Sequence, residues 1–332
     1  REPSIIVHCI NRGSMDSMVA QFETTCHRSY QSFLQVIQQL AIKYRTQSQT
    51  VDAPRLYALT NNAQLVSQLS RSLNIVDALL IGLCRTARNE HPEFIPTLVD
   101  FDWTDSGNWS SAVAEILSGN DEDQVVLHGG QRYVARLEPT LQALTQAESS
   151  SLGSGTALIT GGLGGLGLKL AEHLAMQGCR SLALVGRSGV KPEALQRIER
   201  LRAHRVNVQV FQCDVADRNQ LLQVLEDIQA SMKPLESVFH LAGTLDDGLI
   251  REQSVERLLT VAKAKVLGAI HLSELTSHLL LKHFVLFSSM SAIAGSPGQS
   301  NYAAANACLD ALAYWRRHAG LAATSINWGS WA

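Results

Sequence analysis

The sequence lacks a strong charge of either sign, which limits the partners that it can have. Its 332 residues include 28 Lys+Arg and 30 Asp+Glu, a formal net charge of -2, and the two signs are interleaved without a basic stripe. A protein that binds nucleic acid needs a clustered basic surface, because the phosphates carry the affinity. The composition therefore argues against nucleic acid as the main partner.

The chain also lacks a long apolar run. The most apolar stretch near its end, Leu279–Phe287, is interrupted by Lys282 and His283 and is far too short to cross a bilayer. Residues 1–10 show neither the long apolar core nor the small-residue cleavage site of a signal peptide. We therefore expect no membrane contact, and the strand-like run Ser4–Ile10 so near the start predicts a segment of a larger polypeptide.

Cysteine is scarce and scattered. No two of the six cysteines have the CxxC spacing of a zinc or redox site. In a chain of this size they predict reduced, mostly buried thiols of a cytoplasmic protein, with neither a disulfide framework nor a metal site. The six are Cys9, Cys26, Cys84, Cys179, Cys213 and Cys308.

A Ser/Gly-rich run divides the chain into two parts of different character. Residues 147–155 have no apolar periodicity and predict a flexible linker between residues 1–146 and residues 156–332. In the second part, strand and helix patterns alternate, which predicts an α/β doubly wound parallel sheet, the Rossmann fold. The predicted strands are Thr156–Thr160, Ser181–Gly186, Val206–Cys213, Ser237–Leu241, Phe284–Ser288 and Ala323–Trp328. The predicted helices are Leu166–Gln177, Lys191–His204, Gln220–Ser231, Val255–His278 and Tyr302–His318.

The first part shows a fainter version of the same alternation. Leu56–Thr60 and Thr97–Trp103 have strand patterns and Ile75–Arg88 has a helix pattern between them. No glycine-rich fingerprint accompanies them, so we interpret this part as a truncated, degenerate Rossmann-like structural subdomain without a cofactor site. Periodicity alone also allows a generic α/β domain.

A glycine-rich turn follows the first strand of the second part and opens its first helix. Small residues let the chain turn tightly and approach a pyrophosphate, to which the helix N-terminus offers amide groups and a positive dipole. The apolar residues on both sides argue against the alternative of a flexible linker. The predicted cofactor residues here are Thr160, Gly161, Gly162, Gly164, Gly165, Leu166 and Gly167.

The second predicted strand ends in Arg187 and Ser188, where an NAD enzyme usually has an acid for the ribose hydroxyls. A guanidinium with a hydroxyl neighbour suits a 2′-phosphate, because it forms paired hydrogen bonds to it. This position and the missing acid favour NADPH over the alternative of an ordinary surface arginine.

Two further strand ends are candidate cofactor contacts. Asp214 and Val215 follow the third strand, where a short acid can accept a hydrogen bond from the adenine amine. Ala242 and Gly243 follow the fourth, where small residues let the nicotinamide ribose pack closely. Ordinary strand-end turns are the alternative for both, and we expect His240 to be structural.

Three polar residues form a candidate catalytic set. Ser289 leaves the strand Phe284–Ser288, Tyr302 follows thirteen residues later, and Asn306 lies one helical turn further on the same face. Reduction of a carbonyl needs a proton donor at oxygen and a second donor that holds this oxygen. The reference pKa of tyrosine is about 10, so a nearby cation is needed to ease its ionisation.

The candidate cation is Lys265. In the predicted helix Val255–His278 it shares an apolar stripe with Leu258 and Ala269, whereas Lys263 points elsewhere. Lysine is rarely placed on a core-facing stripe without a partner. The alternative is that Lys265 extends from the edge of the stripe to solvent.

These residues resemble the short-chain dehydrogenase family, and within it the ketoreductase domains of modular polyketide synthases. The family usually has lysine four residues after the tyrosine, whereas this chain has Asn306 there and a lysine in Lys265–Ala269, an exchange similar to polyketide synthases and animal fatty acid synthase. Other matching runs are Gly295–Gln299, Asn301–Asn306 and Asn327–Trp331, and in the first part Gly82–Arg85, Glu90–Pro92 and Asp123–Val125. The resemblance covers nearly the whole chain.

The resemblance implies an NADPH-dependent 3-oxoacyl-ACP ketoreductase. Tyr302 would donate the proton and Ser289 would hold the carbonyl oxygen. Lys265 would bind the nicotinamide ribose and tune Tyr302, while Asn306 would orient Lys265 and a water. The implied substrate is a β-ketoacyl chain on the phosphopantetheine arm of an acyl carrier protein, with other synthase domains as neighbours.

A second group of residues resembles the family's stereochemical fingerprints. Leu245, Asp246 and Asp247 are similar to the class that gives D-configured hydroxyls (B-type), and Ala294 replaces the tryptophan of the opposite class. Pro297, Gln299 and Asn301 accompany them; Pro297 and Asn301 fit the subtype that does not invert the α-carbon, and Ala304 lacks the proline of the inverting subtype. The alternative is an acidic turn without a steering role, since Asp-Asp-Gly is ordinary turn chemistry.

The resemblance also predicts a lid segment beyond Trp331 and Ala332. If this segment is absent, we expect substrate binding to suffer while the nucleotide site survives. Two other functions stay open at this point: a reductase-inactive scaffold, and a ketoreductase-like domain that only epimerises α-substituents. The intact Ser289, Tyr302 and Lys265 favour an active reductase over both.

Overall fold

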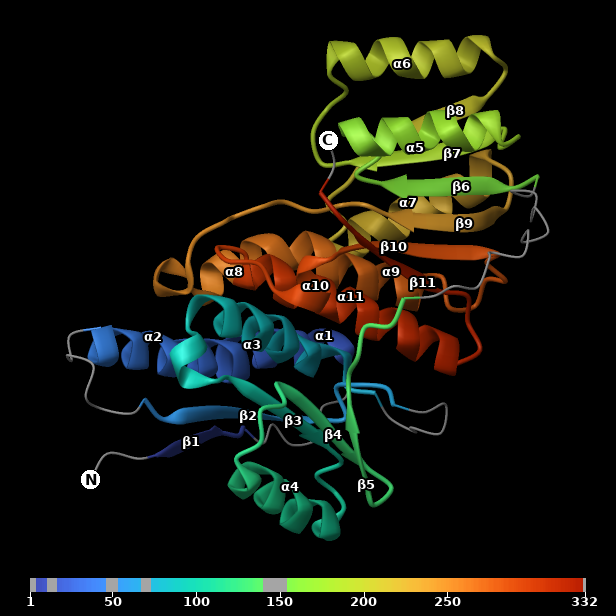
Figure 1. Ribbon diagram of the computed structural model, residues 1–332. Coiled ribbons are helices and arrows are strands. Elements are labelled where there is room, and N and C mark those ends of the chain that lie inside the picture. Colours follow the sequence, from blue (N-terminus) through green and yellow to red (C-terminus); the bar gives the residue numbers. More distant parts are fainter. Residues whose placement is uncertain (1–3, 11–16, 46–52, 67–72, 140–153, 331–332) are drawn as a thin grey trace.

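The computed structural model describes residues 4–10, 17–45, 53–66, 73–139 and 154–330. It contains two sheets, with a layer of helices from both parts of the chain between them (Figure 1). Most of the predicted linker, residues 147–153, lies outside the described residues, as do Trp331 and Ala332. Within the described ranges, no helix is both long enough and apolar enough to span a membrane.

The first sheet has the strand order β1-β2-β3-β4-β5, with parallel neighbours except for the antiparallel last pair. Its strands are β1 (Ile5–His8), β2 (Arg55–Asn61), β3 (Thr97–Phe101), β4 (Gln124–His128) and β5 (Gln131–Val134). The accompanying helices are α1 (Met18–Thr24), η1 (Thr25–Tyr30), α2 (Gln31–Arg45), η2 (Ile75–Asp77), α3 (Ala78–Glu90), η3 (Pro92–Phe94) and α4 (Ser106–Ser118). The predicted strand–helix–strand unit is confirmed as β2, η2 with α3, and β3.

The second sheet has six parallel strands in the order β11-β10-β9-β6-β7-β8. From β6 the strands β7 and β8 follow towards one edge of the sheet, and β9, β10 and β11 then follow from the other side of β6 towards the opposite edge. The predicted doubly wound fold is therefore confirmed. The strands are β6 (Thr156–Thr160), β7 (Ser181–Gly186), β8 (Asn207–Gln212), β9 (Leu235–His240), β10 (His283–Ser289) and β11 (Thr324–Trp328). The helices are α5 (Gly165–Met176), α6 (Pro192–Ala203), α7 (Arg218–Ser231), η4 (Ile250–Glu252), α8 (Val255–Ala262), η5 (Lys263–Leu267), α9 (Gly268–Leu275), α10 (Ser291–Ala294) and α11 (Ser300–His318).

The prediction of one continuous helix over Val255–His278 is wrong in one respect. The structure divides it into α8, the π-helical segment η5 and α9, which ends at Leu275. A π-helical turn holds more residues than an α-helical one and often occurs at functional sites. Lys265 lies inside this segment, so the wide turn sets the direction of its side chain.

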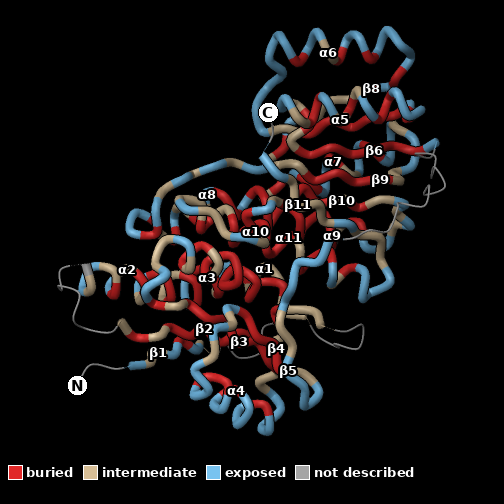
Figure 2. The backbone as a smooth tube through the Cα atoms, in the orientation of Figure 1, coloured by how far each residue is buried: buried red, intermediate tan, exposed pale blue. Residues whose placement is uncertain are grey.

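The two parts of the chain share one apolar core. A continuous cluster of buried side chains includes Leu79 and Leu83 of α3 together with Ala304 and Leu312 of α11, and Figure 2 shows the buried layer between the sheets. A Cβ added at Gly82 would lie 2.3 Å from the backbone of α11. Helices α3 and α11 are therefore in direct backbone contact, which fixes the first part against the helix that carries Tyr302.

Candidate active site

A cleft of about 600 Å³ lies at the carboxyl ends of β6, β7 and β9, beside the point where the strand order reverses. Ligands of doubly wound sheets bind at this kind of position. The predicted cofactor residues that line it are Gly161, Gly164, Gly165, Leu166, Gly167, Arg187, Ser188 and Gly243. The cleft is therefore built mainly from glycine-rich backbone, with the basic residues Arg187, Lys191 and Arg197 also lining it.

Two glycines of the turn have a steric reason to be glycine. Gly161 has a φ of +67°, in the left-handed region that disfavours side chains. A Cβ at Gly167 would lie 2.3 Å from the Gly161 carbonyl oxygen, so a side chain there would push the turn and α5 apart. The N-cap of α5, Gly164, contributes no side-chain hydrogen bond. The first amide groups of this helix can therefore bind an anion.

The other predicted cofactor residues do not line the cleft but lie in or next to the strand ends around it. Gly162 donates its amide to the Val185 carbonyl over 3.0 Å. At the end of β8, Asp214 Oδ1 accepts the Ala216 amide over 3.0 Å, and Val215 is buried. Nothing in the described residues engages the Arg187 side chain in a hydrogen bond or an ion pair, so this exposed guanidinium can bind a phosphate.

His240 has the structural role that we expect. Its Nε2 donates to the Lys265 carbonyl over 2.8 Å, so Nδ1 accepts from the Thr160 hydroxyl over 2.7 Å. The Thr160 oxygen in turn accepts the Ala242 amide over 3.3 Å. Burial lowers the pKa of His240 to about 4, so the ring is neutral at physiological pH. This chain of bonds ties η5 to the ends of β6 and β9.

Lys265 and Tyr302 meet in the interior between η5 and α11. Lys265 is only 4% exposed, and its Nζ lies 5.3 Å from the centroid of the Tyr302 ring. Nζ donates to the Phe287 carbonyl over 2.7 Å, whereas Lys263 is exposed. The alternative that Lys265 extends to solvent is therefore wrong.

The ionisation of this pair is shifted by burial. Burial lowers the pKa of Lys265 to about 8, although the negative charge of Asp310 opposes the change. Burial raises the pKa of Tyr302; the Asn306 amide opposes the shift and the Asp247 charge reinforces it. The expected easing of Tyr302 ionisation by Lys265 is thus not seen in this structure, in which the ammonium bonds to the Phe287 carbonyl.

Asn306 and Ser289 complete the predicted catalytic set. Asn306 Nδ2 donates to the Tyr302 carbonyl over 2.9 Å, one helical turn back. Its Oδ1 is buried and has no hydrogen-bond partner among the described residues, so it can accept a bond from a water or ligand. Ser289, at the end of β10, accepts the Ser291 amide on its Oγ over 3.2 Å. Its neighbour Ser288 donates to the Asn306 carbonyl over 3.2 Å, so the end of β10 lies against the first turns of α11.

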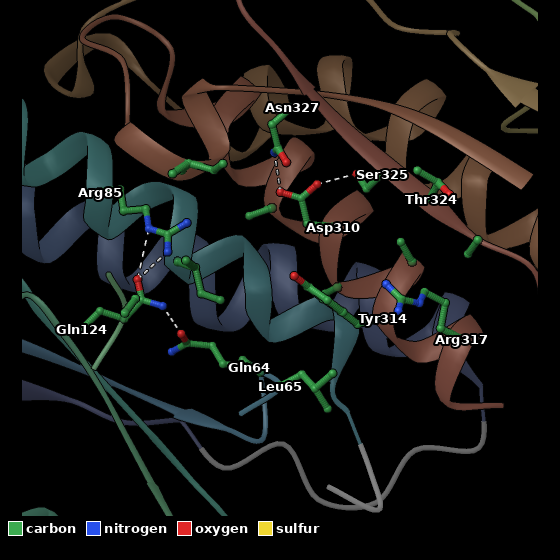
Figure 3. Close-up of a pocket in the computed structure, with 18 residues that line it drawn as sticks. Gln64, Leu65, Arg85, Gln124, Asp310, Tyr314, Arg317, Thr324, Ser325 and Asn327 are labelled. Carbon is green, nitrogen blue, oxygen red and sulfur yellow. Dashed lines mark hydrogen bonds between the residues drawn. The ribbon is translucent and has the colours of Figure 1, made fainter. Parts of the chain in front are cut away.

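The sequence analysis missed Asp310, which lies one helical turn beyond Asn306. Its carboxylate accepts hydrogen bonds from Ser325 Oγ over 2.5 Å and Asn327 Nδ2 over 2.8 Å (Figure 3). Asn327 also donates to the Ser289 carbonyl over 3.2 Å. Burial raises the pKa of Asp310 and these bonds oppose the rise. The available signal was an acid four residues after Asn306, on the face that carries Tyr302.

The residues with predicted stereochemical roles also come together. Asp246 Oδ1 forms an ion pair with Arg257 over 2.7 Å, and its carbonyl accepts a bond from Asn301 Nδ2 over 2.8 Å. Asp247 Oδ2 accepts from Gln299 Nε2 over 3.0 Å. Leu245 is 62% exposed and Pro297 is also exposed, on the same two loops. The segment after β9 and the segment before α11 are therefore joined beside Tyr302.

Comparisons with known proteins agree with this geometry. Residues 155–332 match the family described as KR domain, and residues 2–137 match the Rossmann fold domain of the polyketide synthase extender module SpnB. Polyketide synthase GfsB of Streptomyces halstedii is 41% identical over 283 residues, which are 84% of this chain and 5% of that protein. Erythronolide synthase EryA3 of Saccharopolyspora erythraea is 39% identical over 85% of this chain and 9% of its own length. The chain thus spans a small fraction of these curated relatives.

Solved structures give the same result. The first ketoreductase of the tylosin PKS is 38% identical, with a TM-score of 0.79 over 91% of this chain and 63% of that one. The ketoreductase from the first module of phoslactomycin biosynthesis in Streptomyces sp. HK803 is 34% identical, with a TM-score of 0.76 over 91% of this chain and 68% of that one.

Proposed function

The chain belongs to the KR domain family of polyketide synthases and is an oxidoreductase domain, and from this premise we propose that it reduces a β-ketoacyl group to a β-hydroxyacyl group with NADPH. The observation that carries the proposal is the buried Lys265 ammonium against the ring of Tyr302, next to a glycine-lined cleft. We place the protein in the cytoplasm, as one domain of a larger synthase.

The cleft fits NADPH. The uncapped amide groups at the start of α5 suit the pyrophosphate, and the unengaged Arg187 guanidinium with Ser188 suits the 2′-phosphate. When bound, NADPH supplies the hydride that adds to the carbonyl carbon. Asp214 and Val215 would border the adenine, and Ala242 and Gly243 the nicotinamide ribose. The choice of NADPH over NADH rests on Arg187.

The residues of the chain would supply the other half of the reaction. The Tyr302 phenol would give its proton to the carbonyl oxygen as the carbon is reduced, and the Ser289 hydroxyl would hold that oxygen in place. Lys265, drawn from the Phe287 carbonyl towards the ribose, would stabilise the Tyr302 phenolate that forms. The free Oδ1 of Asn306 would hold a water that returns the proton.

The arrangement also suggests the product. The joined loops that carry Leu245, Asp246 and Asp247 lie beside Tyr302, so they can select the face of the ketone that meets the hydride. We propose a D-configured (B-type) hydroxyl without epimerisation at the α-carbon. The acyl chain would arrive on the phosphopantetheine arm of an acyl carrier protein, and residues 1–146 would serve as a cofactor-free structural subdomain beside the catalytic residues 156–332.

A direct assay tests the proposal. Mixing the protein with NADPH and a model β-ketothioester should give loss of absorbance at the nicotinamide band and a single D-configured alcohol on chiral analysis. Tyr302→Phe should abolish turnover while NADPH binding, followed by fluorescence titration, stays nearly unchanged. No oxidation of NADPH by the full-length domain would point to a scaffold, and exchange at the α-carbon without reduction would point to an epimerase.

A further inference from the structure

The two loops beside Tyr302 are held together by their own bonds. Gly248 donates its amide to the Gly298 carbonyl over 2.7 Å, and the Asp247–Gln299 bond lies next to this contact. The segment after β9 and the segment before α11 therefore form one unit, which we call the paired loops (residues 245–250 and 295–299). The position of this unit decides where a substrate can lie against Tyr302.

One carboxylate from the first part of the chain forms hydrogen bonds to both of the paired loops. Glu90, the last residue of α3, accepts the Gly298 amide on Oε1 over 2.9 Å. Its Oε2 accepts the Ile250 amide over 2.8 Å. Each oxygen thus holds one of the two loops, and hydrogen bonds to a charged acceptor are stronger than those between neutral groups.

The surroundings of Glu90 make it a fixed support. Along α3, Asn89 Nδ2 donates to the Ala294 carbonyl over 2.9 Å, and Arg85 donates to the Ala292 carbonyl. A Cβ at Gly295 would lie 2.5 Å from the Arg85 carbonyl oxygen, so the segment before α11 lies directly on α3. From α2, Gln38 Nε2 donates to the Ile250 carbonyl over 2.8 Å. The first part of the chain therefore contacts both paired loops by specific polar bonds.

We propose that Glu90 is a positioning residue that sets the paired loops and thereby the face of the ketone that is reduced. This rests on the proposed reductase function. Glu90 lies outside the catalytic set and acts on the loops that carry Asp247 and Gln299. The cofactor-free part of the chain would thus control the stereochemistry of a reaction that takes place in the other part.

The test compares Glu90→Ala and Glu90→Gln with wild type, and with Glu93→Gln as the matched control. Glu93 is exposed on the next turn of the chain, where its carboxylate contacts the His91 ring. We expect Glu90→Ala to lower the ratio of major to minor alcohol by at least about tenfold, with a similar loss of kcat/KM, because each of the two lost charged hydrogen bonds is worth about that factor. Glu90→Gln keeps one acceptor oxygen, so it should lower the alcohol ratio and kcat/KM less than Glu90→Ala does. The affinity for NADPH should stay unchanged in both variants.

The outcomes separate the two proposals. If wild type and Glu93→Gln give no alcohol, the proposed function is refuted. If they give one alcohol and the Glu90 variants give it in the same ratio and at the same rate, the role of Glu90 is refuted. A merely structural role would lower the melting temperature and leave the product ratio unchanged. Should Glu90→Ala not fold, the isosteric Glu90→Gln decides the result by the same ratio.

Discussion

Replacing Lys265 by methionine should make the protein more stable and inactive. Burial lowers the pKa of Lys265 from its usual 10.5 to about 8, so the fold carries the charged form at a cost. That difference corresponds to about 3 kcal/mol. Methionine fills a similar volume without charge but leaves the Phe287 carbonyl without its donor, a loss of about 1 kcal/mol. The expected net gain at pH 7 is about 2 kcal/mol.

The pH dependence identifies the cause. Below about pH 8 the lysine is charged in both the folded and the unfolded chain, so the full cost is present. Between about pH 8 and 10.5 the unfolded chain binds more protons than the folded one, so the stability of wild type rises with pH. The advantage of Lys265→Met should therefore shrink by about 3 kcal/mol across this window and end slightly negative.

Urea unfolding at pH values from 7 to 10, with NADPH oxidation assayed in parallel, measures both effects. Lys263→Met is the matched control, because Lys263 is exposed in the same η5 segment, and it should change neither stability nor turnover. If Lys265→Met is less stable than wild type at pH 7, or if its difference from wild type does not change with pH, then the buried charge is not the cost that we describe.

Three other substitutions test separate parts of the structure. Arg187→Ala should raise the Kd for NADPH about tenfold or more and leave that for NADH unchanged, measured by fluorescence titration; equal effects on both would contradict a 2′-phosphate contact. Asp310→Asn removes the charge that raises the pKa of Lys265, so the alkaline limb of the pH–rate profile should move to lower pH; an unmoved limb would show that the two residues are not coupled. Gly82→Ala places a methyl group 2.3 Å from the backbone of α11 and should cost about 1–3 kcal/mol or more in thermal unfolding, and an unchanged melting temperature would contradict the close contact of α3 and α11.

The strands of the second part were the most predictable feature. Thr156–Thr160 and Ser181–Gly186 are found with the predicted bounds, because parallel strands buried on both faces are short apolar runs between turns. Helices α2 and α4 were not predicted. Helix α4 buries few apolar residues, so its pattern is weak. The π-helical segment η5 was also missed, because one wider turn changes the apolar spacing of a helix too little to be recognised in the sequence.

The candidate site was predictable where the residues lie close in sequence or on one helix. Tyr302 and Asn306 are one turn apart, and the glycine turn is a local pattern. The partners of Asp310 come from β11, and those of Glu90 come from loops about 160 to 208 positions away in the chain. Such contacts depend on how the two sheets are placed against each other, which periodicity does not encode.

The backbone contact between α3 and α11 bears on how hybrid synthases are assembled. A chimaera that received residues 156–332 from a different synthase would bring a foreign α11 against the resident Gly82, where no space is available for adjustment. The paired loops that contact Glu90 would then also come from the other synthase. The smallest transferable cassette is therefore the pair of subdomains, and recombination sites belong outside both.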